Sequence, residues 1–259
     1  MQLSVLTFEM KNTVGIVKMN YPPVNAMTKA FLDDMKQVIG HVRHNIHPRS
    51  LVLTSACSGF FSAGDDINTL KNINESLITL LPEVHQLLNE FENLPFPTIA
   101  AINGHALGGG LELAMVCDFR FMGDQSGRIG LPEVRLGMIP VFGGTQRLPL
   151  LIGKGKAVEM MIKGLQFTPD EALKIGLIHD IFPQAEIFDR SLDYAHRLSR
   201  QATAAIGYIK ACINAGLYGG IDRGLEKEIE VFGKNIVSHD AQEGVAAFLE
   251  GRKPEFSGN

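Results

Sequence analysis

Three consecutive glycines lead directly into a glutamate in the sequence Ala106-Leu107-Gly108-Gly109-Gly110-Leu111-Glu112-Leu113-Ala114-Met115. A glycine inside a helix costs about 1 kcal/mol relative to alanine, so helix propensity does not explain the run. Two interpretations remain: a tight turn where backbone segments pack closely, or a helix N-terminus whose N–H groups face a ligand oxygen. A nucleotide-binding P-loop is excluded, because no Gly-Lys-Ser/Thr follows.

A second glutamate follows in Gly130-Leu131-Pro132-Glu133-Val134, where proline can start a short helical turn. Either acid can simply complement a helix dipole, and Glu133 can pair with Arg128 or Arg135. The apolar neighbours of Glu112 favour burial, which raises a carboxyl pKa toward the range that suits proton transfer. Backbone donors beside two such carboxylates would stabilise an oxyanion and move protons, which indicates an enzyme.

A glycine-containing loop follows the short apolar strand expected at Leu51-Val52-Leu53. It contains Ala63-Gly64-Asp65-Asp66-Ile67, and active sites of α/β proteins gather at such strand ends. The two aspartates could instead cap a helix or bind a metal. We expect no metal, because adjacent aspartates lack supporting ligands at useful spacing. His105 is interpreted as a structural histidine rather than a pocket residue.

The composition limits the partners of this chain of 259 residues. A net charge of -4 gives no general attraction for nucleic acid or anionic membranes. The three cysteines have no paired spacing, and no apolar segment is long enough to cross a bilayer. The N-terminal residues lack the pattern of a signal peptide. We therefore expect a cytoplasmic protein without nucleic-acid or membrane partners.

Alternating strand and helix patterns predict an α/β core. Strands are expected at 3–9, 14–19, 51–53, 97–102 and 178–182, and helices at 28–44 and 75–94. From about Ala185 onward the pattern is helical, with apolar stripes at Ile221, Leu225, Ile229, Phe232 and Ile236 and at Val245, Phe248 and Leu249. We predict a catalytic core at 1–195 and a helical region at 196–259 that acts as a lid, an oligomer interface or both.

Taken together, these segments resemble the enoyl-CoA hydratase/isomerase family, also called the crotonase family. The resemblance rests on residues 61–67, 101–112 and 131–148, the last ending in Gly143-Gly144-Thr145-Gln146-Arg147-Leu148. It implies a spiral of ββα units with a C-terminal helical region that builds trimers or dimers of trimers. It also implies an acyl-CoA thioester substrate and no separate cofactor.

The resemblance assigns roles to individual residues. The backbone N–H groups of Asp65 and Gly109 would form an oxyanion hole for the thioester carbonyl. Glu112 and Glu133 would hold one water over the double bond, with Glu112 assisting addition at C3 and Glu133 donating the proton at C2. The implied contacts to CoA and substrate are Ala26, Ala63, Ile67, Val141, Phe232 and Lys253.

Two positions depart from the usual hydratase pattern. Val141-Phe142 replaces a glycine-containing pair, which is expected to narrow the acyl pocket or reshape the water site. Asp65 stands where alanine is common. Because both glutamates are present, the resemblance favours reversible hydration of trans-2-enoyl-CoA to 3-hydroxyacyl-CoA in fatty-acid or related acyl-CoA breakdown. The alternatives are a Δ3,Δ2-enoyl-CoA isomerase and a non-catalytic acyl-CoA-binding or carrier-protein-linked subunit.

Overall fold

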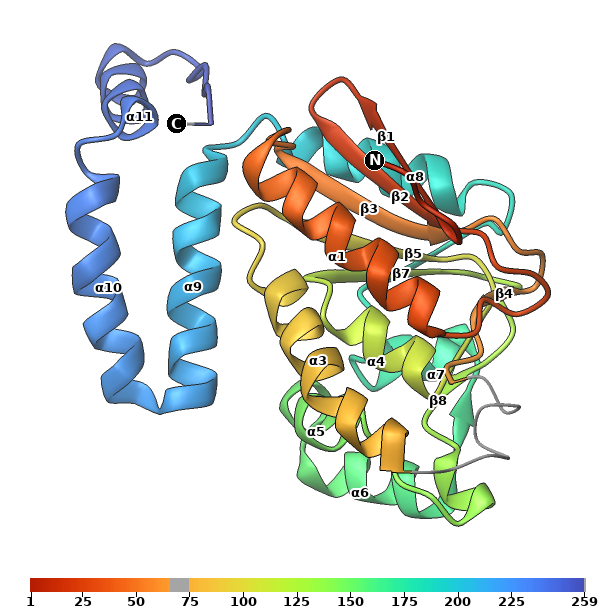
Figure 1. The fold of residues 1–259 in the computed structure, drawn as a ribbon. Helices are drawn as coiled ribbons and strands as arrows, with labels where there is room; N and C mark the ends of the chain where they lie inside the picture. Colours follow the sequence, from red (N-terminus) through yellow and green to blue (C-terminus); the bar gives the residue numbers. More distant parts are fainter. Residues whose placement is uncertain (66–74, 259) are drawn as a thin grey trace.

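The computed structural model describes residues 1–65 and 75–258, and a six-stranded sheet forms the body of this part (Figure 1). The strand order is β1-β2-β3-β5-β7-β10. Its strands are β1 (Leu6–Lys11), β2 (Val14–Met19), β3 (Ser50–Ser55), β5 (Thr98–Ile102), β7 (Phe119–Gly123) and β10 (Asp180–Phe182). The pair β1–β2 is antiparallel, and the remaining neighbours are parallel. This arrangement confirms the α/β prediction.

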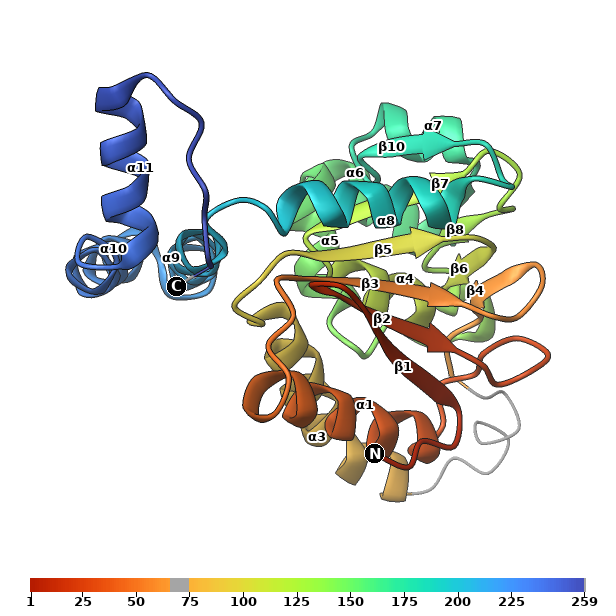
Figure 2. The same cartoon turned by 90° about the horizontal axis from the view of Figure 1, so that it is seen from above.

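Helices cover both faces of this sheet (Figure 2). On one face, α1 (Lys29–His44), α3 (Glu75–Glu92) and α4 (Gly109–Met115) enclose a core that includes Leu53 and Ala100. On the other face, α8 (Ile187–Leu198) packs against the neighbouring positions in the strands, including Val52 and Ile99. Burial on both faces explains why the central strands are continuous apolar runs without alternation.

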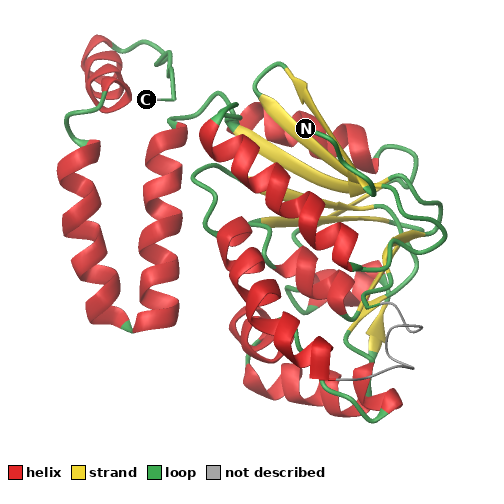
Figure 3. Cartoon of the chain, in the orientation of Figure 1, coloured by secondary structure: helices red, strands yellow, loops and turns green. Residues whose placement is uncertain are grey.

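A smaller four-stranded sheet brings the glycine-rich segments together. Its order is β4-β6-β8-β9, formed by β4 (Phe60–Ser62), β6 (His105–Leu107), β8 (Ile129–Gly130) and β9 (Gln166–Phe167). The first three of these strands are parallel. Their carboxyl ends therefore lie at one edge, where the chain continues into Gly64, Gly108 and Glu133. The secondary structure around this edge is shown in Figure 3.

The first strand corrects the boundary predicted from the sequence. The expected strand at 3–9 begins at Leu6 and continues to Lys11. The shift arises because the Asp34 carboxylate accepts the N–H groups of Ser4, Val5 and Leu6 at 2.7, 2.7 and 3.0 Å. A buried side chain thus satisfies the N–H groups at this end of the strand. The helix predicted from Thr28 to His44 is confirmed, with Thr28 as its N-cap.

The C-terminal helices project away from the sheet (Figure 1). These are α9 (Thr203–Gly219), α10 (Ile221–Asn235) and α11 (His239–Glu250). They follow η1 (Glu133–Leu136), α5 (Gly144–Ile152), α6 (Lys154–Lys163) and α7 (Pro169–Lys174) in the body. Helix α9 docks on the body through Lys210, whose ammonium binds the Phe96 carbonyl at 2.9 Å and Asp118 at 2.7 Å. The predicted division at 195/196 stays a prediction.

The predicted apolar stripes are exposed on these helices. They comprise Ile221, Leu225, Ile229 and Phe232 on α10 with Ile236 at its C-cap, and Val245, Phe248 and Leu249 on α11. None of the helices in residues 1–65 and 75–258 has both the length and the apolarity needed to cross a membrane. Unpartnered apolar area of this extent is typical of an interaction surface.

Candidate active site

A cavity of about 650 Å³ lies at the edge where the three motif-bearing strands end. Its polar lining comes from Asp65, Glu112, Glu133 and Arg135. Its apolar wall is formed by Ile78, Leu81, Leu136, Met138, Ile139 and Val141. An apolar cavity with a few convergent polar groups is the usual form of a small-molecule site.

The backbone at Gly64 and Gly109 forms one side of this cavity. Gly64 has a φ of +85°, and a Cβ at this position would lie 2.7 Å from the Gly109 nitrogen and 2.9 Å from the Leu107 carbonyl oxygen. Only glycine permits both this backbone conformation and this approach. Gly109 is the first residue of α4, so its N–H has no acceptor within the helix. The two glycine-rich segments thus place residues 65 and 109 side by side.

Glu112 is buried beneath this backbone, with 2% of its surface exposed. Its Oε1 accepts hydrogen bonds from the Phe142 N–H at 2.8 Å and the Gly144 N–H at 2.6 Å. Burial raises the pKa of Glu112 to about 8, and the nearby charge of Glu133 contributes in the same direction. The two backbone donors oppose this rise, because they stabilise the ionised form. Glu112 therefore titrates near neutrality, as the sequence predicted for a buried acid.

Glu133 is the first residue of the short helix η1, directly after Pro132. Its Oε2 is buried and has no hydrogen-bond partner within the described parts of the chain. Its Oε1 lies 3.0 Å from the position that a Cβ on Gly108 would occupy. Burial raises the pKa of Glu133 to about 7, and Asp65 adds to this rise. The unpaired Oε2 beside the glycine-rich turn is available to a ligand.

Sequence comparison identifies the family of this protein. A sequence model of the enoyl-CoA hydratase/isomerase family matches residues 9–259. The chain belongs to this family. It is 36% identical to the short-chain-enoyl-CoA hydratase of Clostridium acetobutylicum, with 98% of each chain covered. It is 35% identical to the crotonyl-CoA hydratase of Syntrophomonas wolfei, with 97% of each chain covered.

Solved structures agree with this assignment. The crystal structure of an enoyl-CoA hydratase from Bacillus anthracis matches with a TM-score of 0.91 at 31% identity, covering 99% of this chain and 100% of that one. The chain therefore has the crotonase fold, with its parallel sheets and C-terminal helices. The fold class expected from the resemblance is confirmed.

Three of the family-derived contact residues are described in the body of the protein. Ala63 and Val141 line the cavity with the glutamates. Ala26 is buried next to Met27, which pairs with Asp65, and is not part of the cavity lining. Ile67 lies outside the described residues. Ala63 and Val141 thus lie at the candidate reaction centre, and Ala26 lies beside the bridge between Met27 and Asp65.

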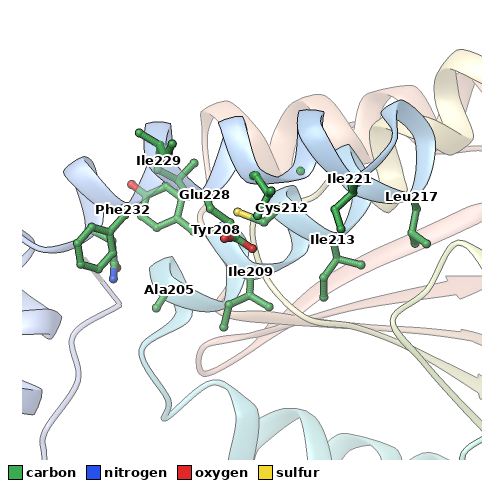
Figure 4. A pocket seen from close by; sticks show the side chains of 15 residues that line it. Ala205, Tyr208, Ile209, Cys212, Ile213, Leu217, Ile221, Glu228, Ile229 and Phe232 are labelled. Carbon is green, nitrogen blue, oxygen red and sulfur yellow. The ribbon is translucent and has the colours of Figure 1, made fainter.

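Phe232 and Lys253 lie in the helical C-terminal region rather than at the cavity. The Phe232 side chain is 61% exposed and lines a groove between α9 and α10 with Ile209, Ile213 and Ile229 (Figure 4). Lys253 follows α11 and has no carboxylate within salt-bridge distance among the described residues. The adjacent Arg252 is bound by Glu243 and Glu250. Lys253, unlike Arg252, therefore has no carboxylate partner among the described residues.

The loop before α5 holds contacts that the sequence did not reveal. Phe142, expected to narrow the acyl pocket, is buried; a Cβ on Gly109 would lie 2.9 Å from its ring. Val141 lines the cavity, and its carbonyl accepts a hydrogen bond from His85 Nε2 at 2.6 Å. The donors to Glu112 come from residues 30 and 32 positions away. The only local signal for this turn is Gly143-Gly144. It indicates a turn but does not indicate that the turn's N–H groups bind Glu112.

Other candidate groups have structural surroundings. His105 accepts a hydrogen bond from the Arg128 N–H at 3.0 Å and contacts the Phe60 ring, in line with its interpretation as structural. The part of the chain that the structure describes contains no group of three His, Cys, Asp or Glu side chains suited to a metal ion.

Proposed function

We propose that this protein catalyses the reversible syn-hydration of trans-2-enoyl-CoA to 3-hydroxyacyl-CoA. The observation that carries the proposal is the placement of two carboxyl groups with raised pKa values, Glu112 and Glu133, in one cavity beside Asp65 and Gly109. Two relatives over nearly the full length are named as hydratases of crotonyl-CoA and of short-chain enoyl-CoA. The work of such an enzyme belongs to fatty-acid or related acyl-CoA breakdown.

In the proposed reaction the thioester carbonyl accepts hydrogen bonds from the N–H groups of Asp65 and Gly109. These donors stabilise the enolate charge that develops when water adds to C3, and such preorganised dipoles supply a large part of catalysis. Glu112 accepts a proton from the attacking water, and Glu133 delivers a proton to C2. The water's hydroxyl and one proton are added across the double bond, and the reverse reaction exchanges the roles. The chemistry needs no cofactor beyond the CoA of the substrate.

The protonation of the pair sets the pH range of this reaction. Burial raises the pKa of Glu112 to about 8 and that of Glu133 to about 7, so both carboxyls change protonation near neutrality and titrate as a pair. Two N–H donors favour the ionised form of Glu112, whereas Glu133 Oε2 accepts no hydrogen bond among the described residues. We expect a bell-shaped rate profile, because loss or gain of a proton by the pair removes either the acid or the base.

The assembly is part of the proposal. Exposed apolar residues of α10 and α11 would be covered in a trimer or a dimer of trimers. Phe232 would then contact the CoA adenine bound to a neighbouring subunit, and Lys253 would contact a CoA phosphate. In this arrangement the helical region completes the substrate site as well as holding the subunits together.

The test is turnover of crotonyl-CoA by the purified protein, followed as loss of the conjugated-thioester absorbance. We expect hydration by the wild type and its loss in Glu112→Gln, because the carboxylate that accepts a proton from water is removed. The isomerase alternative uses Glu133 alone and would keep its activity in this variant. A 3-enoyl-CoA converted at the wild-type rate by Glu112→Gln would favour isomerisation. CoA binding without turnover across short and medium enoyl-CoAs would favour the non-catalytic alternative.

A further inference from the structure

Arg147 binds the loop that supplies both hydrogen bonds to Glu112. It lies in the first turn of α5 with 7% of its surface exposed. Its Nη1 donates to the Phe142 carbonyl at 3.3 Å. That carbonyl belongs to the peptide between residues 142 and 143. The peptides on either side of it carry the Phe142 and Gly144 N–H groups that bind Glu112 Oε1. The guanidinium therefore holds the middle one of three successive peptides.

Helix α3 fixes the other side of the same guanidinium. Arg147 Nη2 donates to Asn89 Oδ1 at 2.6 Å and to Glu92 Oε2 at 2.9 Å, and Nε donates to the same oxygen at 3.1 Å. Asn89 and Glu92 are three residues apart on one helix and so share a face. The Tyr218 hydroxyl of α9 donates to the second Glu92 oxygen at 2.8 Å. The contacts thus run from α9 through α3 to the loop at Glu112.

The loop itself is shaped around the guanidinium. Gly143 has a φ of +102°, and a Cβ at this position would lie 2.2 Å from Arg147 Nη1. Any larger residue would both strain the backbone and displace the arginine. A buried ion pair alone is weak grounds for a functional role, because it often does no more than satisfy its own charges. Here the guanidinium also binds the loop whose N–H groups donate hydrogen bonds to Glu112.

We propose that Arg147 is a positioning residue that keeps the N–H groups of Phe142 and Gly144 on Glu112 Oε1. Its kinetic consequence rests on the proposed hydratase function, whereas its effect on Glu112 does not. The two donors stabilise the carboxylate form and oppose the effect of burial. If the loop moves away, burial acts with less opposition, and the pKa of Glu112 rises further above its ordinary value.

Arg147→Lys tests this role with the charge preserved. Lysine lacks the planar fork that reaches Glu92, Asn89 and the Phe142 carbonyl together. We expect the Glu112 carboxyl, observed by ¹³C NMR and assigned with Glu112→Gln, to titrate at higher pH than in the wild type. For hydration we expect kcat to fall about tenfold, as loss of one hydrogen bond's worth of stabilisation predicts. KM should change little, and the acidic limb of the rate profile should move upward with the titration.

Arg120→Lys is the matched control. Arg120 is also buried, but its guanidinium binds the Leu177 and Cys117 carbonyls at 2.9 and 2.7 Å rather than the loop at Glu112. We expect it to lower stability without moving the Glu112 titration. Equal titration shifts in the two variants would overturn the proposal, as would an unchanged titration in Arg147→Lys.

Asn89→Ala decides the question if Arg147→Lys does not fold. Asn89 is exposed and neutral, so its removal deletes the 2.6 Å bond to Arg147 without a change of charge. We expect a smaller upward shift of the Glu112 titration, and a shift of zero would contradict the proposal. The titration needs no substrate, so the positioning role of Arg147 can be refuted while the hydratase activity is observed. Equally, hydration can fail while the titration shift is observed.

Discussion

Two apolar hollows in the described part of the protein differ in what they can do. The groove between α9 and α10 has a volume of about 960 Å³, larger than the cavity of about 650 Å³ in the body. Its acid, Glu228, lies on an exposed helix face. In the cavity, Glu112 and Glu133 are withdrawn from water and converge on glycine backbone. Volume and apolarity therefore do not identify the site, whereas desolvated acids beside backbone donors do.

The sharpest test of this contrast replaces one acid in each hollow. Glu133→Gln should lower the hydration rate by about 10²–10⁴, because the proton donor to C2 is lost. Glu228→Gln removes the same charge from the groove and should leave kcat within about twofold, since no proton transfer is assigned there. Initial rates with crotonyl-CoA check both. Similar losses in the two variants would show that the contrast is wrong.

The second test addresses the backbone donors of the cavity. A Cβ at Gly64 would lie 2.7 Å from the Gly109 nitrogen, so Gly64→Ala should displace one oxyanion donor. We expect kcat/KM to fall by about 10²–10³, the usual cost of such a donor. Gly40→Ala is the control, because a Cβ there has no atom within 4 Å. Circular dichroism should show both variants folded; a fully active Gly64→Ala would refute the assignment.

The third test addresses the groove. Ile213→Asp places a charge among the exposed apolar residues of α9, where an assembled neighbour would desolvate it. We expect the dissociation constant of the assembly to rise by about tenfold to a hundredfold, measured as molecular mass against concentration by light scattering. The Glu112 titration should stay unchanged. Ile162→Asp, also exposed but on α6 and outside the groove, should keep the wild-type mass.

The last test concerns stability against pH rather than activity or assembly. Glu112 has a folded pKa of about 8 against an ordinary 4.5, so the folded protein keeps a proton that the unfolded chain loses. Stability is therefore highest below pH 4.5 for this group and is lost as pH rises toward 8. Denaturant unfolding should show a decline of up to about 1.4 kcal/mol per pH unit that Glu112→Gln lacks. Parallel pH dependence in the two proteins would contradict the burial argument.

Local sequence signals predicted the elements that they specify directly. Thr28 as an N-cap and the apolar face from Phe31 to Val42 defined α1, and the continuous apolar runs defined β3 and β5. The strands β8 and β9 were not predicted, because two residues show no periodicity. Their sheet is nevertheless what aligns the glycine-rich segments. Short strands of this kind are specified by their neighbours in space rather than by their own sequence.

The sequence indicated which residues belong to the candidate site, but not the hydrogen bonds that hold them in place. The glycines before Glu112 and the proline before Glu133 identified both acids, and the structure places them in one cavity. The hydrogen bonds from Phe142 and Gly144 to Glu112, and the clamp of Arg147, join residues that are distant in sequence. No pattern in a single sequence encodes such pairings. The roles given to Phe232 and Lys253 stay predictions, since they depend on a neighbouring subunit.

The docking of α9 has a consequence for hydrogen exchange. Gly207 lies against Pro95, where a Cβ would be 2.5 Å from the carbonyl oxygen, and Tyr218 reaches Glu92. Helix α10 packs along α9 rather than on the central sheet. Amide protons of these two helices should therefore exchange through a local opening, while those of β3 and β5 wait for global unfolding. Each opening also breaks the Tyr218–Glu92 bond, so the motion of α9 alters a contact that is three hydrogen bonds away from the Glu112 carboxyl.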